Sequence, residues 1–205
     1  MRFKILALMI RLFDIFFSFL GLIVFSPLFF IISLFIIFTS PGAIFFIQTR
    51  VGRNNKDFRM IKFRTMKVGS EKQGLLTVGS ADSRITVPGR WLRKYKLDEL
   101  PQLFNVLVGD MSLVGPRPEV RKYVDMYTPE QMRVLNVRPG LTDWASLEYF
   151  HENDLLSAAK DPEETYIREI MPAKININFR YIDNPSLSSY FKVLIRTFTK
   201  ISSAP

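Results

Sequence analysis

The longest apolar run in the sequence constrains the fold more than any other feature. From Leu12 to Phe38, "LFDIFFSFLGLIVFSPLFFIISLFIIF", the only charged residue is Asp14. As one helix, this run of 27 residues would be about 40 Å long, more than the roughly 30 Å hydrocarbon core of a bilayer requires. It is too long for a cleaved signal peptide, and no small-residue cleavage site follows it. We therefore expect this segment to lie in a membrane.

Ser26 and Pro27 interrupt the run near its centre. A proline inside a helix removes one backbone hydrogen bond and clashes with the preceding turn. In a membrane, a neighbouring serine hydroxyl can satisfy a carbonyl that is freed in this way. The pattern is compatible with an ordinary span that tolerates a kink, because prolines are frequent in membrane helices. The alternative is a re-entrant helix, bent at Pro27, that enters and leaves the membrane by the same face.

Basic residues flank the run on both sides. Residues 1–67 hold ten Lys/Arg and two Asp/Glu, a balance of +8, whereas residues 68–205 hold eighteen and seventeen, a balance of +1. The positive-inside tendency would keep both flanks on the cytoplasmic side, which favours the re-entrant alternative. Cations beside an apolar run are typical of contact with anionic lipid headgroups. Because a nucleic-acid binder would spread its cations over the folded domain, we expect membrane lipids and no nucleic acid as partners.

The composition of the whole chain indicates a second, water-exposed part. The chain has 205 residues, of which 48% are hydrophobic and 23% charged. It contains no cysteine, which excludes disulfides, thiolate nucleophiles and cysteine-ligated zinc. We expect residues 1–40 to form the membrane helix and residues 41–205 a compact cytoplasmic domain.

Local patterns after the membrane segment predict a mainly helical α+β domain. The strand-like runs 43–52 and 57–66, separated by the polar residues 53–56, predict a small β-hairpin. Helices are expected over 129–137 and 161–171, the second with a proline at its start. Together with the membrane helix, these elements predict a monotopic membrane protein of α+β class.

The last segment, residues 186–201, "SLSSYFKVLIRTFTKI", predicts an amphipathic helix. Its apolar side chains recur on one stripe and its cations, Lys192, Arg196 and Lys200, on another. This pattern is typical of a helix that lies in the membrane interface. It is equally typical of a helix packed on the protein core with a solvated basic face, and both interpretations are kept.

Two adjacent carboxylates, Asp98 and Glu99, follow the segment 84–96, which holds five cations and no acid. A helix is expected to begin near Asp98 and to end at Gly109. The side chains that it is expected to bury are Leu100, Leu103, Phe104 and Leu107. The segment 109–119, rich in glycine and proline, is expected to form a tight loop.

The Asp98-Glu99 pair has two interpretations. In the first it only caps the helix, because Asp is a favoured N-cap and Glu suits the first turn. In the second the helix start is a phosphate site, since it keeps a carboxylate ionised and attracts phosphate. Adjacent helix positions do not share a face, so one acid could attack phosphorus while the other binds Mg²⁺.

Three segments resemble a known family. They are "KFRTM" at 62–66, "LRKYKLDELPQLFNVLVGDMSLVGPRPE" at 92–119 and "VRPGLTDWA" at 137–145. They are similar to the bacterial sugar transferases, the monotopic phosphoglycosyl transferases that initiate glycan assembly on polyprenyl (undecaprenyl) phosphate. The Ser26-Pro27 break is similar to the hinge of the re-entrant helix in that family, and the chain length resembles the family's minimal catalytic core.

The resemblance implies a role for each matching residue. Asp98 would attack the β-phosphate of a UDP-sugar and release UMP, leaving a phosphosugar–aspartyl intermediate that polyprenyl phosphate then attacks. Glu99 would help to bind Mg²⁺, the expected cofactor, and to position the phosphate. The binding residues would be Arg93 for phosphate and Arg117, with its neighbours Pro116 and Pro118, for the nucleotide. The enzyme would lie at the bacterial inner membrane with both termini in the cytoplasm.

Two positions differ from the family's usual pattern. Lys96 stands where a small hydroxyl residue is common, which questions the usual helix cap, and Asp143 stands where glycine is usual, which questions the loop geometry. Neither is expected to touch the two acids or Arg117. The aromatic residues Trp144 and Tyr149-Phe150 are expected to pack in the core or an interface rather than to line a sugar pocket.

Two rival functions are considered. A non-catalytic membrane adaptor would use its basic flanks to bind lipid and its Asp-Glu pair only as a helix cap. It predicts no release of nucleotide from any UDP-sugar. A polytopic sugar-phosphate transferase would need several membrane spans, and the sequence has one apolar run.

Overall fold

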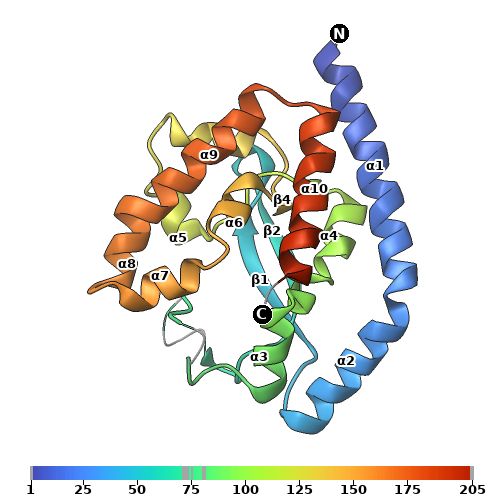
Figure 1. Cartoon of the computed structure of the whole chain (residues 1–205), viewed down its shortest axis with the longest axis vertical. Helices are drawn as coiled ribbons and strands as arrows, with labels where there is room; N and C mark the ends of the chain where they lie inside the picture. The colour runs from blue at the N-terminus through green and yellow to red at the C-terminus, as the bar shows by residue number, and fades with distance from the viewer. Residues whose placement is uncertain (1, 71–73, 75, 80–81, 204–205) are drawn as a thin grey trace.

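The computed structural model describes residues 2–70, 74, 76–79 and 82–203 of the chain (Figure 1). Helices predominate and two small sheets accompany them, which confirms a mainly helical α+β fold. The helices and strands are α1 (Arg2–Val24), α2 (Ser26–Thr39), β1 (Phe45–Val51), β2 (Asp57–Phe63), α3 (Val87–Lys94), α4 (Gln102–Val108), β3 (Ser112–Val114), α5 (Arg121–Val124), β4 (Gly140–Thr142), α6 (Trp144–Glu148), α7 (Glu152–Ala158), α8 (Pro162–Thr165), α9 (Met171–Asp183) and α10 (Leu187–Ser202).

The apolar run forms two helices, α1 and α2, which meet at Phe25 with φ −88° and ψ 1°. Pro27 lies in the first turn of α2, where it cannot supply the N–H that would reach the carbonyl of Ile23. The Ser26 hydroxyl donates to that carbonyl instead, at 2.7 Å. The predicted interruption is thus confirmed. Of the two helices, α1 is long and apolar enough to cross a membrane, judged by length and composition.

One face of α1 lies against the rest of the protein, with α4 and α10 beside it (Figure 1). Asp14, the one acid of the apolar run, is buried there. Its Oδ1 accepts hydrogen bonds from the Ser112 hydroxyl at 3.1 Å, the Leu113 amide at 2.9 Å and the Tyr190 hydroxyl at 2.8 Å. Because a buried carboxylate is costly unless donors surround it, these bonds explain how an acid fits into the run. They attach the helix to β3 and α10.

A second contact joins α1 to α4. The Arg11 guanidinium donates to the carbonyls of Val106 and Leu107 at 2.6 and 2.9 Å, which satisfies the end of α4. Gly21 lets the two helices approach, because a Cβ there would lie 3.0 Å from a methyl group of Leu103. The remaining faces of α1 expose large apolar side chains, including Ile5, Leu8, Leu12, Phe16, Phe19 and Ile23. Such an exposed apolar surface indicates contact with lipid.

The predicted hairpin is confirmed as an antiparallel pair, β1 and β2, with Phe45 opposite Phe63 and Val51 opposite Asp57. Asn54 and Asn55 take the two left-handed positions of the turn, a conformation that asparagine tolerates well. The side chain of Asn105 in α4 then bridges to β2. Its amide donates to the Arg59 carbonyl at 2.8 Å, and its oxygen accepts from the Ile61 amide at 3.1 Å. These bonds fix α4 on the hairpin.

A second sheet replaces part of the predicted loop 109–119. Strand β3 pairs in parallel with β4, with Ser112 opposite Gly140 and Val114 opposite Thr142. The prediction missed this pairing because three-residue strands have too few positions to show a period. Gly115 and Gly140 bring the two backbones close together, since a Cβ on Gly140 would lie 2.1 Å from the Gly115 nitrogen. The chain leaves this close contact directly into Pro116.

Helix α4 differs from its predicted form. It begins at Gln102, and Asp98 lies before it in a 3₁₀ turn, Leu97–Glu99. Gly109 ends the helix in a left-handed conformation, as predicted. Leu103 is buried as expected, but Phe104 is exposed. The reason is that Asn105, the next residue of α4, faces β2, so that Phe104 faces outward.

The later helices are as predicted in outline. Residues 131–136 form a 3₁₀ helix, and the second predicted helix becomes α8, a π-helical turn at Tyr166–Ile170 and α9. Helix α10 buries Tyr190 and Val193 in the core and exposes Ile195 and Phe198. One face of α10 therefore packs on the protein, and apolar side chains on another face stay exposed.

Candidate active site

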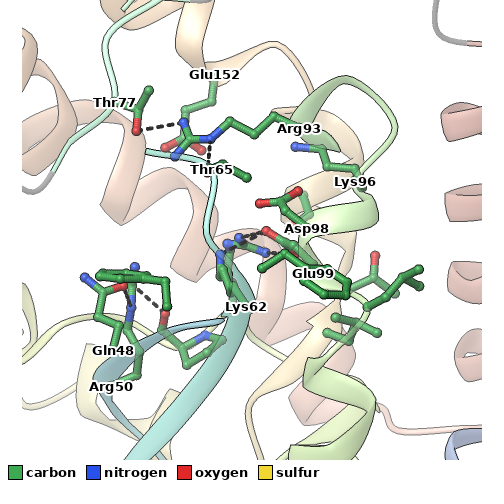
Figure 2. Close-up of a pocket in the computed structure, with 18 of the residues that line it drawn as sticks. Gln48, Arg50, Lys62, Thr65, Thr77, Arg93, Lys96, Asp98, Glu99 and Glu152 are labelled. Atoms are coloured by element: carbon green, nitrogen blue, oxygen red, sulfur yellow. Dashed lines mark hydrogen bonds and ion pairs between the residues drawn. The ribbon is translucent and has the colours of Figure 1, made fainter. Parts of the chain in front are cut away.

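A cavity of about 1110 Å³ contains most of the predicted site residues (Figure 2). Asp98, Glu99, Arg93, Arg117 and Pro118 all line it. Pro116 lies outside this cavity, beside a smaller pocket, and its carbonyl accepts from the Gly140 amide at 2.9 Å. The hinge residues Ser26 and Pro27 lie at the junction of α1 and α2 and do not line the cavity.

Asp98 is buried, with 6% of its surface exposed. Its Oδ1 has no hydrogen-bond partner among the residues that the structure describes. Burial raises the pKa of Asp98, the charge of Glu99 raises it further, and three cations oppose the rise: Lys62, Arg93 and Lys96. No side chain caps the start of α4 by a hydrogen bond, so the interpretation of this pair as a plain helix cap is wrong. A buried carboxylate oxygen without a donor is typical of a reactive group.

Glu99 is held by two cations. The Arg117 guanidinium donates hydrogen bonds to both carboxylate oxygens of Glu99, and the Lys62 ammonium donates to Oε1 at 3.1 Å. Burial alone would raise the pKa of Glu99, but the charges of Arg117 and Lys62 outweigh burial and hold this pKa well below its ordinary value. In return, Glu99 raises the pKa of Arg117. Glu99 is therefore ionised, and it orients both cations toward the cavity.

Lys62 is a site residue that the sequence reasoning did not assign. It lies on β2, and burial lowers its pKa to about 8, with the charge of Glu99 opposing this change. The one signal for it was its place at the start of "KFRTM". Its contact with Glu99 joins residues 37 positions apart in the chain, which no local pattern predicts.

Arg93 reaches the cavity from α3, held by two hydroxyls (Figure 2). Its Nε donates to Thr65 Oγ1 at 2.9 Å and its Nη1 to Thr77 Oγ1 at 3.1 Å. Burial lowers the pKa of Arg93, and Asp98 opposes this. Because neutral hydroxyls hold the guanidinium in place, its positive charge remains available to pair with a bound anion.

Asp143 contacts Arg117, contrary to expectation. Its Oδ2 accepts from the Arg117 backbone N–H at 3.0 Å and from the Asn178 amide at 2.8 Å. Its Oδ1 accepts from the Ser146 N–H and so caps α6. A glycine could make none of these bonds. The loop that carries Arg117 is thus held here by a carboxylate.

Lys96 makes no side-chain cap, in agreement with the doubt raised by the sequence. It adopts φ 55°, a left-handed conformation, directly before the turn that carries Asp98. Its ammonium lies 5.5 Å from the centre of the Phe150 ring. It lines the cavity and so adds a positive charge next to the two acids.

The aromatic residues divide into two groups. Trp144 packs as expected, because its indole N–H donates to Ser189 Oγ at 3.2 Å and Arg196 lies 5.2 Å above its ring. Tyr149 and Phe150 instead line the cavity. They offer apolar faces there, on which a sugar or a nucleobase could rest.

Glu99 fits a magnesium site of the kind completed by substrate. Among the described residues, no cluster of three or more Asp, Glu or His side chains could hold a metal alone. Magnesium is commonly bound by one or two carboxylates, with substrate phosphates and waters filling the other positions. The carboxylate of Glu99, which lines the cavity beside Asp98, suits this role.

The comparisons with known proteins agree with one another. Residues 5–204 match the family described as "Bacterial sugar transferase". Over 191 residues, 92% of the chain, the sequence is 40% identical to a UDP-N-acetylgalactosamine-undecaprenyl-phosphate N-acetylgalactosaminephosphotransferase of Aeromonas hydrophila, of which 42% is covered.

Two further relatives are UDP-glucose:undecaprenyl-phosphate glucose-1-phosphate transferases. The chain is 38% identical to that of Caulobacter vibrioides over 176 residues, 84% of this chain and 62% of the relative. It is 38% identical to that of Escherichia coli over 163 residues, 76% of this chain and 35% of the relative. The chain thus spans less than two thirds of each relative. The three names specify two different sugars, so similarity at this level does not identify the sugar.

Proposed function

Because the chain belongs to the bacterial sugar transferase family, we propose that it transfers a sugar 1-phosphate from a UDP-sugar to polyprenyl phosphate and releases UMP. This would be the first membrane step of a surface glycan. The observation that carries the proposal is the state of Asp98, a buried carboxylate with one oxygen that has no hydrogen-bond partner among the described residues. The cations around this pair of acids are Lys62, Arg93, Lys96 and Arg117.

In the first step, an Asp98 oxygen attacks the β-phosphorus of the UDP-sugar. A phosphorus–oxygen bond to the carboxylate forms, the bond to the oxygen bridging the two phosphates breaks, and its electron pair leaves with UMP. Arg93 and Lys96 offset the charge of the diphosphate, which would otherwise repel both acids. Burial favours the attack, because a poorly hydrated carboxylate has less water to displace.

In the second step, a phosphate oxygen of polyprenyl phosphate attacks the same phosphorus. The new diphosphate bond forms, the bond to Asp98 breaks, and the carboxylate regains its charge. Glu99 holds Arg117 and Lys62 at the reacting phosphate throughout. Both nucleophiles are anions, so neither step requires a general base.

Magnesium would bind to Glu99 and to the donor phosphates, and when bound it would neutralise negative charge on those phosphates. The ion pairs of Glu99 satisfy part of its carboxylate. The Asp98 oxygen that has no hydrogen-bond partner among the described residues is then left for the attack on phosphorus.

The membrane arrangement that we propose is the re-entrant one. The broken helix, basic residues on both flanks and the attachment of α1 to the folded domain all support it. It would keep the catalytic domain and both termini on the cytoplasmic side of the bacterial inner membrane. The acceptor phosphate sits at headgroup level, and a domain fastened to a shallow helix would hold Asp98 at that level.

Replacing Asp98 with Asn tests the nucleophile. The variant keeps the shape of the side chain but removes the attacking charge, so we expect UMP release to fall by about 10³-fold or more. Purified protein would be incubated with Mg²⁺ and a panel of UDP-sugars, and intact-protein mass spectrometry would look for an added sugar phosphate. Asp125→Asn, on an exposed residue outside the cavity, is the control.

The same experiment distinguishes the proposed transferase from the rival function, a lipid-binding adaptor. A lipid-binding adaptor would release no UMP and form no adduct with any UDP-sugar. Near-normal turnover of the Asp98→Asn variant would overturn the assignment of Asp98 while leaving the enzyme class intact.

A further inference from the structure

The cavity around Asp98 also holds an ion pair that the proposed chemistry does not use. Glu152 begins α7 and Lys174 lies on α9, and both side chains line the cavity. The Lys174 ammonium donates to Glu152 Oε2 at 2.5 Å. The Glu152 side chain is 23% exposed and the Lys174 side chain 13%. We call these two residues the α7–α9 ion pair.

Stability alone explains the α7–α9 ion pair poorly. The contact joins two helices, but a largely buried ion pair contributes little net stability, because both ions lose hydration. Apolar side chains at the two positions would hold the helices together without that loss. A charged pair in the wall of a cavity is better explained by a ligand that needs both an acceptor and donors of hydrogen bonds.

Two contacts join the α7–α9 ion pair to the phosphate side of the cavity. Arg93 Nη1 donates to Thr77 Oγ1 at 3.1 Å. The Gly79 amide donates to the carbonyl of Asn153, the residue after Glu152, at 3.2 Å. The segment 77–79 therefore connects the start of α7 to Arg93. Figure 2 draws Glu152, Thr77 and Arg93 together among the residues that line the pocket.

This location fits the sugar of the donor better than its uridine. Burial lowers the pKa of Arg93, and Asp98 is close enough for its charge to oppose that change. Asp98 would attack the β-phosphate, which carries the sugar directly, whereas the α-phosphate separates the β-phosphate from uridine. Groups on the Arg93 side of the cavity are therefore placed to meet the sugar.

The chemistry of the α7–α9 ion pair also suits a sugar. Its two charges cancel, so the pair does not attract a diphosphate. A sugar hydroxyl both donates and accepts hydrogen bonds, and a carboxylate beside an ammonium can satisfy both functions. The ammonium carries three N–H donors, and its contact with Glu152 uses one of them. Tyr149 and Phe150, shortly before Glu152 in the chain, line the same cavity and offer apolar faces to a sugar ring.

We propose that Glu152 and Lys174 bind hydroxyl groups of the donor sugar and thereby select the UDP-sugar. This assignment rests on the proposed function. A site built to hydrogen-bond a particular hydroxyl rejects a sugar that does not present it there, because buried polar groups of the site are then left unpaired. The α7–α9 ion pair is thus a specificity determinant, separate from the groups that bind the phosphates.

Two single variants with matched controls test this role. Glu152→Gln keeps the length of the side chain but removes its charge and replaces one acceptor oxygen with a donor. Lys174→Met keeps a long side chain but removes the donors. The controls are Glu163→Gln and Lys122→Met. They alter a second Lys–Glu ion pair, whose side chains are 48% exposed and do not line the cavity.

UMP release is measured with a panel of UDP-sugars that includes UDP-glucose and UDP-galactose, which differ in the orientation of one hydroxyl. The readout is kcat/KM for the best donor of the unaltered protein, divided by kcat/KM for each other donor. We expect this ratio to fall by about tenfold in Glu152→Gln and in Lys174→Met, and to stay unchanged in both controls. Because the ratio compares two donors on the same protein, partial unfolding of a variant does not affect it.

Inhibition by UMP provides a second measurement. UMP contains the uridine and the α-phosphate but no sugar, so its inhibition constant should be the same in the unaltered protein and in both variants. An increase in this constant would assign the α7–α9 ion pair to the nucleotide and overturn the proposal.

An unchanged ratio would also overturn it. If kcat/KM fell equally for every donor, the ion pair would only hold α7 on α9. The proposed function fails in a different way, namely if the unaltered protein releases UMP from no UDP-sugar and forms no adduct. UMP release by the unaltered protein, together with an unchanged ratio in the variants, would contradict this inference alone.

Discussion

Lys96 has a backbone conformation that its residue type disfavours. Its φ of 55° is left-handed, which costs a residue with a Cβ about 1–2 kcal/mol. The same residue places a positive charge beside Asp98 and opposes the rise in its pKa. Strain of this kind is often tolerated at functional sites.

We predict that Lys96→Asn makes the protein more stable and less active. Asparagine adopts left-handed backbone more readily, so the free energy of unfolding should rise by about 1 kcal/mol. UMP release should fall, because one cation near the diphosphate is lost. Thermal unfolding in detergent and initial rates would measure the two effects. Lys94→Asn, at an exposed position with helical backbone, should neither raise stability nor lower UMP release. A destabilised Lys96→Asn would contradict the prediction.

The lowered pKa of Lys62 predicts that the activity depends on pH. Burial lowers its pKa to about 8, so above this pH Glu99 loses one of its two cationic partners. We expect kcat/KM for the UDP-sugar to fall as pH rises through about 8. In Lys62→Arg, where the side chain stays charged, this fall should disappear.

Stability should change in the opposite direction over the same range. Between pH 8 and the ordinary lysine pKa of 10.5, the unfolded chain binds more protons at this residue than the folded one. The contribution of Lys62 to the free energy of unfolding therefore increases with pH. Activity and unfolding, followed together between about pH 7 and pH 10, would reveal the difference. If stability fell together with activity, the fall in activity would be attributed to unfolding.

Among the elements, α1 is connected to both segments that carry the site. Arg11 satisfies the end of α4, which begins three residues after Glu99. Asp14 holds β3, which ends three residues before Arg117. Helix α1 therefore supports the position of the candidate site residues.

A graded series at Asp14 tests this connection. All three donors reach Oδ1, so Asp14→Asn should keep the contact. Tyr190→Phe removes one donor and should cost about 1 kcal/mol. Asp14→Leu leaves three buried donors without an acceptor and should cost about 3 kcal/mol or more.

The series is measured by unfolding in detergent, by UMP release and by membrane fractionation. We expect membrane association to persist in every variant, because the apolar run becomes more apolar in Asp14→Leu. UMP release should fall in the order of the stability losses. Full activity in Asp14→Leu would show that α1 acts as an anchor alone.

At the scale of the whole molecule, the proposed re-entrant arrangement predicts that the break at Pro27 decides how the chain meets the membrane. Pro27→Ala restores the N–H that can reach the Ile23 carbonyl, so α1 and α2 can join into one helix. Residues 2–39 would then measure about 57 Å, enough to cross a bilayer completely. We expect an N-terminal tag to be reachable only from the cytoplasm in the unaltered protein and from outside in the variant.

The control for this experiment is Ser26→Ala. It removes the hydroxyl bond to Ile23 but keeps the proline, so the tag should stay cytoplasmic. Accessibility is measured by labelling the tag in intact and permeabilised cells. A tag reachable only from outside in the unaltered protein would contradict the re-entrant arrangement.

Several features of this protein follow from the sequence alone because they depend on neighbours in the chain. Local backbone sterics or local hydrophobic content explain four of these features: the apolar run, its break at Pro27, the asparagine turn of the hairpin and the end of the helix at Gly109. The Asp98-Glu99 pair was also recognisable, since its residues are adjacent and its surroundings are basic. These features predicted the class of fold and most of the candidate site.

Other features required the tertiary structure because they join distant segments. Asp14 accepts from Leu113, 99 positions away, and Asp143 accepts from Arg117, 26 positions away. The hydrogen-bond partners of a buried polar group are the groups that the fold brings within hydrogen-bond distance. The periodicity of the sequence does not indicate which groups these are. For the same reason, the burial of Lys62 against Glu99 and the outward turn of Phe104 were decided only when α4 and the hairpin came together.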